Sequence, residues 1–133
     1  MKILLDTTVL IDILKGDVRA IRQIGELKKE SVIYTTTINT YELLRGIYLL
    51  PKGREKYAEA LRTLVSNLHI LDINLEASEK AALIYAELRK KGIEIDGPDY
   101  LIAGACLVNG ISVLVTRNEK HFSKIGGLDV RTY

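Results

Sequence analysis

The sequence has 133 residues, 47% of them hydrophobic, which suits one domain with its own core and excludes a disordered chain. Its 19 basic and 17 acidic residues give a net charge of +2, far from the strong positive excess of histone-like or ribosomal proteins. A single cysteine excludes an internal disulfide and a zinc site built on cysteines, and two histidines argue against a His-rich metal site.

No segment resembles a targeting signal or a membrane span. The apolar run at the N-terminus is interrupted by Asp6, which makes it too short for a signal peptide. The longest later run, residues 101–108, is far shorter than the roughly 20 residues that cross a bilayer. We therefore expect a soluble, cytoplasmic protein with no membrane partner.

Short β-branched segments alternate with longer amphipathic ones along the chain. The predicted elements, in chain order, are a strand at 2–5, helices at 8–14 and 18–29, a strand at 31–34, helices at 39–50 and 54–67, a strand at 68–73, helices at 76–91 and 98–109, a strand at 112–115 and a weaker strand at 128–131. This alternation predicts a single three-layer α/β/α domain over residues 1–133, with a central, mainly parallel sheet of four to five strands.

Four polar residues fall where this topology places the carboxyl ends of the strands, the edge at which such folds bind ligands. Asp6 follows the first strand, Glu42 lies early in the helix after the second, Asp99 opens the helix at 98–109, and Asn118 follows the fourth strand. The topology brings all four to one edge of one sheet.

Each of these residues also has a local explanation. Asp6 is a favoured residue for capping the helix that follows it. Asn39 or Thr40 caps the next helix, and Glu42, three residues after Asn39, then resembles a capping box. Asp99 in a first helical turn meets the positive end of the helix dipole, and Asn118 is a common turn residue.

Three carboxylates at contact distance repel one another by about 1–4 kcal/mol per pair, depending on the local dielectric. A hard divalent cation removes this cost, and ligand sets made only of oxygen select Mg²⁺ or Mn²⁺. Such a centre suits phosphodiester hydrolysis, because the cation generates a water nucleophile and stabilises the leaving oxygen.

The motifs around these acids resemble those of PIN-domain proteins, and more narrowly the VapC-type ribonuclease toxins of toxin–antitoxin pairs. The resemblance lies in residues 3–12, 39–46, 99–103 and 114–122, and it spans essentially the whole chain. It implies that Asp6, Glu42 and Asp99 ligate Mg²⁺ or Mn²⁺.

The resemblance also assigns supporting residues around the metal. Thr7 or Thr8 would orient ligands or phosphate, and Thr116 with Asn118 matches a Thr-x-Asp/Asn element. His121 stands where many relatives carry a second Asp, which puts a second metal position in doubt.

The implied activity is endonucleolytic cleavage of RNA by a metal-activated water. A homodimer and a small VapB-type antitoxin that blocks the groove are the implied partners. Arg45 and Arg117 are candidate phosphate contacts, and Asp96, in the loop before the helix at 98–109, is a further acid near the site.

Three other functions fit part of the pattern. A receiver-like phosphoacceptor domain would use Asp72 as acceptor and Thr116 as switch hydroxyl, but it wants an acidic pair after the first strand, where only Asp6 is present. A haloacid-dehalogenase-like phosphatase needs a second Asp two residues after Asp6, where Thr8 stands. A non-catalytic RNA-binding module would give no reason to gather carboxylates where phosphate approaches.

Overall fold

The computed structural model describes all 133 residues. Its elements, in chain order, are β1 (Lys2–Leu5), α1 (Thr7–Leu14), α2 (Val18–Lys28), β2 (Val32–Thr36), α3 (Thr37–Tyr48), α4 (Arg54–Ser66), β3 (His69–Leu71), α5 (Leu75–Lys90), α6 (Gly97–Val108), β4 (Val113–Val115), α7 (Glu119–Phe122) and β5 (Asp129–Arg131). The five strands form one sheet in the order β3-β2-β1-β4-β5, and every neighbouring pair is parallel.

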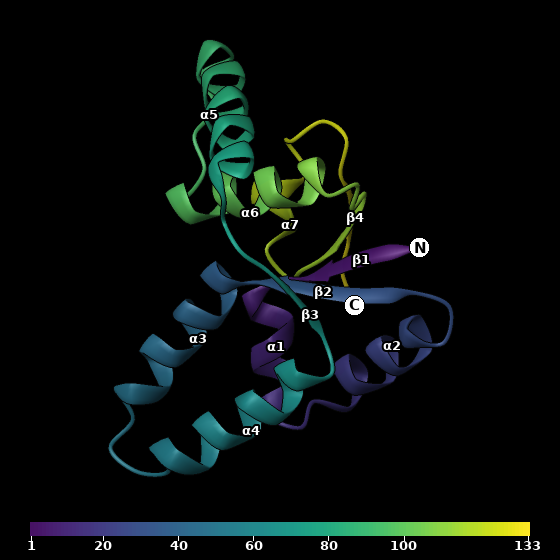
Figure 1. Cartoon of the computed structure of the whole chain (residues 1–133), viewed down its shortest axis with the longest axis vertical. Coiled ribbons are helices and arrows are strands. Elements are labelled where there is room, and N and C mark those ends of the chain that lie inside the picture. Colours follow the sequence, from purple (N-terminus) through teal and green to yellow (C-terminus); the bar gives the residue numbers. More distant parts are fainter.

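Two hydrophobic cores cover the two faces of this sheet (Figure 1). Successive side chains of a strand point to opposite faces, so Leu4 packs with residues of α5, α6 and α7, while Ile3 and Leu5 pack with residues of α1, α3 and α4. Figure 1 shows α5 and α6 on one side of the sheet and the helices α1 to α4 on the other. The predicted three-layer α/β/α architecture is therefore confirmed.

The structure differs from the predicted elements in β2, β3 and α7, and at the start of α3, which is described with the site below. β2 runs on to Thr36 instead of ending at residue 34, because its last residues pair with β3. β3 covers only His69–Leu71 and is not a buried strand, since it lies at the sheet edge with β2 as its one neighbour. The helix α7 was not predicted, because four residues are too few to display a helical period.

The strand order places a topological switch point between β1 and β4. From β1 the chain builds outward through β2 and β3 on one side, and then returns to add β4 and β5 on the other. At such a point the connections leave the sheet in opposite directions and open a crevice beyond the carboxyl ends of the strands. Asp6 directly follows β1 here, and Thr116 directly follows β4. None of the helices is both long and apolar enough to span a membrane.

Candidate active site at the carboxyl edge of the sheet

Asp6 is buried at the switch point and is fixed by two hydrogen bonds. Its residue is 4% exposed; Oδ2 accepts from Thr116 Oγ1 at 2.7 Å and Oδ1 accepts from Asn39 Nδ2 at 3.1 Å. Asp6 occupies the N-cap position of α1, but its side chain makes no capping hydrogen bond. Helix capping therefore does not explain the position of this carboxylate. It binds Thr116 and Asn39 instead of the backbone of α1.

Burial raises the pKa of Asp6 above its ordinary value, because a charged carboxylate loses hydration there. The hydrogen bond from Thr116 is the largest effect that lowers this pKa, and the donors of Thr7 and Asn39 act in the same direction. The surrounding neutral donors thus favour the ionised form without supplying a positive charge.

Glu42 is held from the other side of the crevice by Thr7, whose Oγ1 donates to Glu42 Oε1 at 2.8 Å. Thr7 in turn accepts from Asn39 Nδ2 at 2.9 Å, so one buried amide orders the side chains of Asp6 and Thr7 together. Asn39 is completely buried. It is the supporting residue that the sequence did not reveal, because its role there was that of a helix cap.

The expected cap of α3 was wrong. Thr36 is the N-cap, its hydroxyl accepts from the Asn39 backbone N–H at 3.2 Å, and Asn39 returns the bond as the third helical residue of a capping box. The helix begins two residues earlier than predicted, because β2 is longer and delivers Thr36 in an extended conformation at the helix start. Glu42 is therefore not part of the cap, and its carboxylate is free for the crevice.

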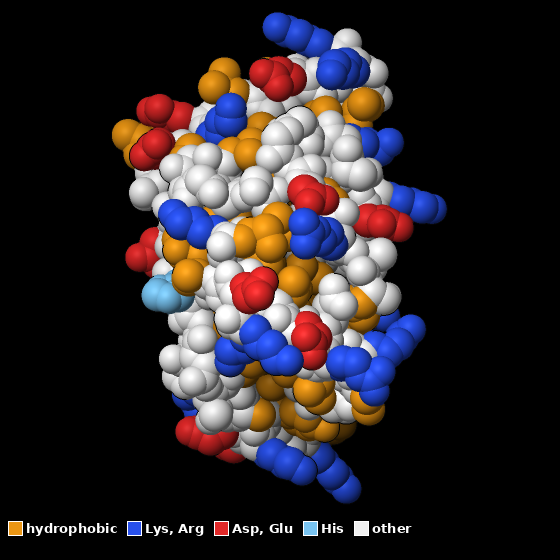
Figure 2. Space-filling model, turned by 90° about the vertical axis from the view of Figure 1, so that its right-hand side faces the viewer, with side chains coloured by type: hydrophobic (Ala, Val, Ile, Leu, Met, Phe, Trp, Pro, Cys, Tyr) orange, Lys and Arg blue, Asp and Glu red, His pale blue; other side chains and the backbone are white.

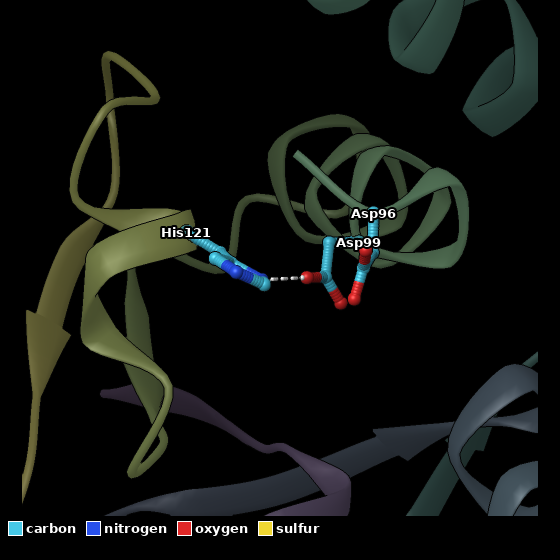
Figure 3. Close-up of side chains that lie close together, drawn as sticks. All are labelled: Asp96, Asp99 and His121. Atoms are coloured by element: carbon cyan, nitrogen blue, oxygen red, sulfur yellow. Dashed lines mark hydrogen bonds and ion pairs between the residues drawn. The ribbon is translucent and has the colours of Figure 1, made fainter. Parts of the chain in front are cut away.

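Asp99 lies in the first turn of α6, where it is 7% exposed. Burial raises its pKa from 3.8 to about 6; the negative charges of Asp6 and Asp96 add to the rise, and the hydrogen bond with His121 opposes it. His121 Nδ1 lies 2.8 Å from Asp99 Oδ2 and 2.9 Å from Asn118 Nδ2. Figure 3 shows His121 pointing from α7 to Asp99, with Asp96 beside Asp99 at the start of α6.

These contacts draw the predicted site residues into two groups. Asp96, Asp99 and His121 offer ligand atoms that all lie within 4.8 Å of one another, and no other three acidic, histidine or cysteine side chains do so. Asp6 and Glu42 form the second group, joined through Thr7 and Asn39 as described above.

The donor set fits a divalent cation. No Lys or Arg side chain forms an ion pair with Asp6, Glu42 or Asp99, whose only partner of this kind is His121 on Asp99. No Lys or Arg side chain therefore compensates the negative charge at this edge. Carboxylate oxygens are the ligands that Mg²⁺ and Mn²⁺ prefer.

Of the remaining predicted residues, Thr8 and Thr116 are bound into this centre, and Arg45 forms no hydrogen bond or ion pair with it. Thr8 Oγ1 accepts from the Arg117 backbone N–H at 3.0 Å and so ties the start of α1 to the segment after β4. Thr116 Oγ1 also accepts from the Asn118 backbone N–H at 2.9 Å. Arg45 is exposed on α3, with its guanidinium 5.3 Å from the centre of the Tyr41 ring.

A largely apolar cavity of about 370 Å³ adjoins the site between α1, α3 and α4. Its lining includes Ile11, Leu14, Ile47 and Leu50, together with Glu42. The cavity therefore runs from an apolar surface to one of the predicted cation ligands.

Comparison with known proteins agrees with this fold. The PIN domain matches residues 3–128 of the chain. Ribonuclease VapC1 of Methanocaldococcus jannaschii is 31% identical over 132 residues, covering 99% of this chain and 87% of that protein. The tRNA(fMet)-specific endonuclease VapC of Shigella flexneri is 28% identical over 130 residues, covering 96% and 95%. The crystal structure of VapBC2 from Rickettsia felis, bound to a DNA fragment from their promoter, contains a chain with a TM-score of 0.91 at 26% identity, covering 100% of this chain and 99% of that one. The chain therefore belongs to the PIN-domain family and, within it, to the VapC ribonucleases.

Proposed function

We propose that residues 1–133 act as one nuclease domain, the toxin of a VapBC-type pair, which cleaves RNA with Mg²⁺ or Mn²⁺ held by Asp6, Glu42 and Asp99. The observation that carries the proposal is that Asp6 and Asp99 are both buried, with the charge of Asp6 raising the pKa of Asp99, and that neither they nor Glu42 has a Lys or Arg partner. Burying charge without a partner is costly, so a fold that retains it there needs a cation from solution.

A bound divalent cation would supply a water of lowered pKa and positive charge for the phosphoryl oxygens. The chain's own part is to keep the ligands ionised and in place. Thr116 and Asn39 orient Asp6, while Thr7 orients Glu42. Such support from neighbouring donors typically changes metal affinity or activity by about 10–100-fold.

The deciding experiment measures RNA cleavage by the purified chain with Mg²⁺, with Mn²⁺ and with EDTA. The first RNA is tRNA(fMet), because the relative from Shigella flexneri is named for it, and an unstructured RNA serves as comparison. Asp6→Asn and Asp99→Asn should each lower the rate by more than the roughly 10–100-fold loss typical of supporting residues. They should also abolish cation binding in calorimetry.

Asp72→Asn is the matched control, since Asp72 is an exposed acid after β3. It should cleave RNA as the wild type does. Equal cleavage by the Asp6 and Asp99 variants would instead indicate a contaminating nuclease and refute the site. The same control addresses the receiver-like alternative, which the topology disfavours because β2 separates the strand of Asp72 from β1.

We infer further that a VapB-type antitoxin occupies the apolar cavity between α1, α3 and α4. Two features support this occupant: the apolar lining suits one face of a peptide helix, and Glu42 at the cavity offers a partner for a basic side chain. An antitoxin docked there would also cover the carboxylate edge. The predicted homodimer and the cytoplasmic location stay predictions.

Gly46 offers a clean test of the antitoxin site. It lines the cavity from α3, and a Cβ at this position would meet nothing within 4 Å. Gly46→Leu should therefore place an apolar side chain at the cavity, raise stability by up to about 1 kcal/mol through better helix propensity, and weaken antitoxin binding more than tenfold. Gly25→Leu on α2, where a Cβ is equally unobstructed, is the control. Unchanged antitoxin affinity in the Gly46 variant would place the antitoxin elsewhere.

A further inference from the structure

A third buried carboxylate, Asp12, lies on α1 outside the predicted cation ligands. Its side chain is 8% exposed, and its Oδ2 lies 2.9 Å from Arg117 Nε and accepts a hydrogen bond from Tyr133 Oη. Buried ion pairs add little to stability on average, and apolar replacements of similar size are often as stable. Folding alone therefore does not explain why this position carries an acid.

Arg117 is anchored at two points, yet its outer edge faces solvent. Its backbone N–H donates to Thr8 Oγ1, and it directly follows Thr116, whose hydroxyl binds Asp6. The side chain is 48% exposed, and the ion pair with Asp12 is made through Nε. Neither Nη group donates a hydrogen bond within the protein, so their four N–H donors remain available beside the site.

We propose that Arg117, clamped by Asp12 and Tyr133, binds the RNA backbone phosphate next to the one that is cleaved. This inference rests on the ribonuclease function proposed above. Asp12 lies six residues beyond Asp6 along α1, a separation of about 9 Å along the helix axis. A guanidinium held at Asp12 is thus too far from Asp6 to share its phosphate, but it lies along the same edge.

The clamp suits phosphate recognition because it fixes the plane of the guanidinium before RNA arrives. The free edge of an arginine matches two phosphate oxygens, and a side chain that is already ordered loses less entropy on binding. Burial, together with the hydrogen bond to Asp12, raises the pKa of Tyr133 well above its ordinary value. Its phenol is therefore held as a hydrogen-bond donor to Asp12.

The surface charge makes single contacts of this kind important. On the face shown in Figure 2, basic and acidic side chains are interspersed and do not form one basic surface. With a net charge of only +2, long-range attraction of RNA is weak, so affinity depends on individual arginines placed against phosphates.

The test measures binding of a short single-stranded RNA by fluorescence anisotropy in the Asp99→Asn background, so that the RNA is not cut. Arg117→Lys keeps the positive charge and the ion pair with Asp12 but removes the two Nη groups that would contact phosphate. It should weaken RNA binding about tenfold. Arg117→Ala should in addition lower the slope of log affinity against log salt by about 0.7, the value for one lost contact on a single strand.

Asp12→Asn separates positioning from charge. The variant leaves Arg117 in place and makes the protein more positive, so a purely electrostatic role predicts tighter RNA binding. Loss of the clamp predicts instead about threefold weaker binding with an unchanged salt slope. With Asp99 intact, both Asp12→Asn and Arg117→Lys should raise KM while kcat stays within about twofold, as expected for a contact made equally in ground and transition states.

Arg62→Lys is the matched control, because Arg62 is also about half exposed and pairs with an acid, Glu59, on α4. It should bind RNA as the wild type does. If the Asp12 and Arg117 variants lower Tm but leave RNA affinity and KM unchanged, the clamp is purely structural and the inference is refuted. If the wild-type chain neither binds nor cleaves RNA, the proposed function itself fails, and the inference fails with it.

Discussion

Asparagine in place of Asp99 should make the cation-free protein more stable at neutral pH. Burial raises the pKa of Asp99 from 3.8 to about 6, so the folded chain holds this proton more tightly than the unfolded chain does. The stability that the protonated Asp99 carboxyl contributes to the folded state is therefore full below about pH 4. It is lost as the pH rises towards 6 and remains lost at higher pH. At 1.36 kcal/mol per unit, the ionised carboxylate costs about 3 kcal/mol at neutral pH.

Asparagine has the same shape and no charge, so it avoids most of this cost, although it exchanges one charged hydrogen bond to His121 for a neutral one. We expect a net gain of about 1–3 kcal/mol in EDTA near pH 7.5, or roughly 5–10 °C in Tm. The gain should fall to a small fraction of this near pH 4, where the folded wild-type carboxyl is protonated and the unfolded one is only about half ionised.

Thermal unfolding followed by circular dichroism measures this directly. Saturating Mn²⁺ should reverse the order of stability, because a ligand that binds only the folded wild type stabilises it by mass action. Asp72→Asn, at an exposed acid, should unfold as the wild type does at both pH values. The reasoning is refuted if Asp99→Asn lowers Tm in EDTA at neutral pH, or if its gain is the same at pH 4.

Three further substitutions test the support of the site and the packing behind it. Asn39→Ala removes a fully buried amide that binds Asp6. The free energy of unfolding in urea should fall by about 2–4 kcal/mol, and the cleavage rate should fall about 10–100-fold. A kcat equal to that of the wild type would contradict this. Thr116→Val removes the 2.7 Å hydrogen bond to Asp6, so the pKa of that acid should rise further and the acid limb of the rate profile should move to higher pH. Gly104→Ala would place a Cβ 2.5 Å from the backbone of α5 and should destabilise the fold by about 1–3 kcal/mol. Gly25→Ala, whose Cβ would have no atom within 4 Å, should instead stabilise the fold by about 0.5–1 kcal/mol. Equal chemical-denaturation midpoints for the two variants would contradict the close packing of α6 on α5.

The sheet could be predicted because its central strands are buried on both faces. β1 and β4 are continuous apolar segments, and that pattern is specific to strands covered by helices on two sides. β3 has a similar composition, yet it is largely exposed and shorter than expected. Its position at the sheet edge depends on how β2 pairs. That pairing is a property of the whole fold and cannot be read from residues 68–73 alone.

The site was predictable where it follows from strand ends, and unpredictable where it depends on choices between equivalent local partners. Asp6 and Asp99 could be placed at the sheet edge from the sequence because each lies directly after a strand or in the first turn of a helix there. Thr36 and Asn39 are both good capping residues, so local chemistry could not decide between them. The pairing of β2 with β3 decides it, and it thereby turns the Asn39 amide towards Asp6, 33 residues away in the chain.

The three buried carboxylates show where this chain departs from the rules that favour folding. Asp12 is matched by the chain's own arginine, whereas Asp6 and Asp99 have only hydroxyl, amide and imidazole groups around them. Neutral donors can orient an anion, but they do not cancel its charge, so the pKa values of both acids remain raised. The charge of Asp12 is balanced within the protein by Arg117. The outer edge of that guanidinium is available to a phosphate. The two buried acids without an arginine are the ones to which we assign the cation, and that difference separates the proposed cation site from the clamp beside it.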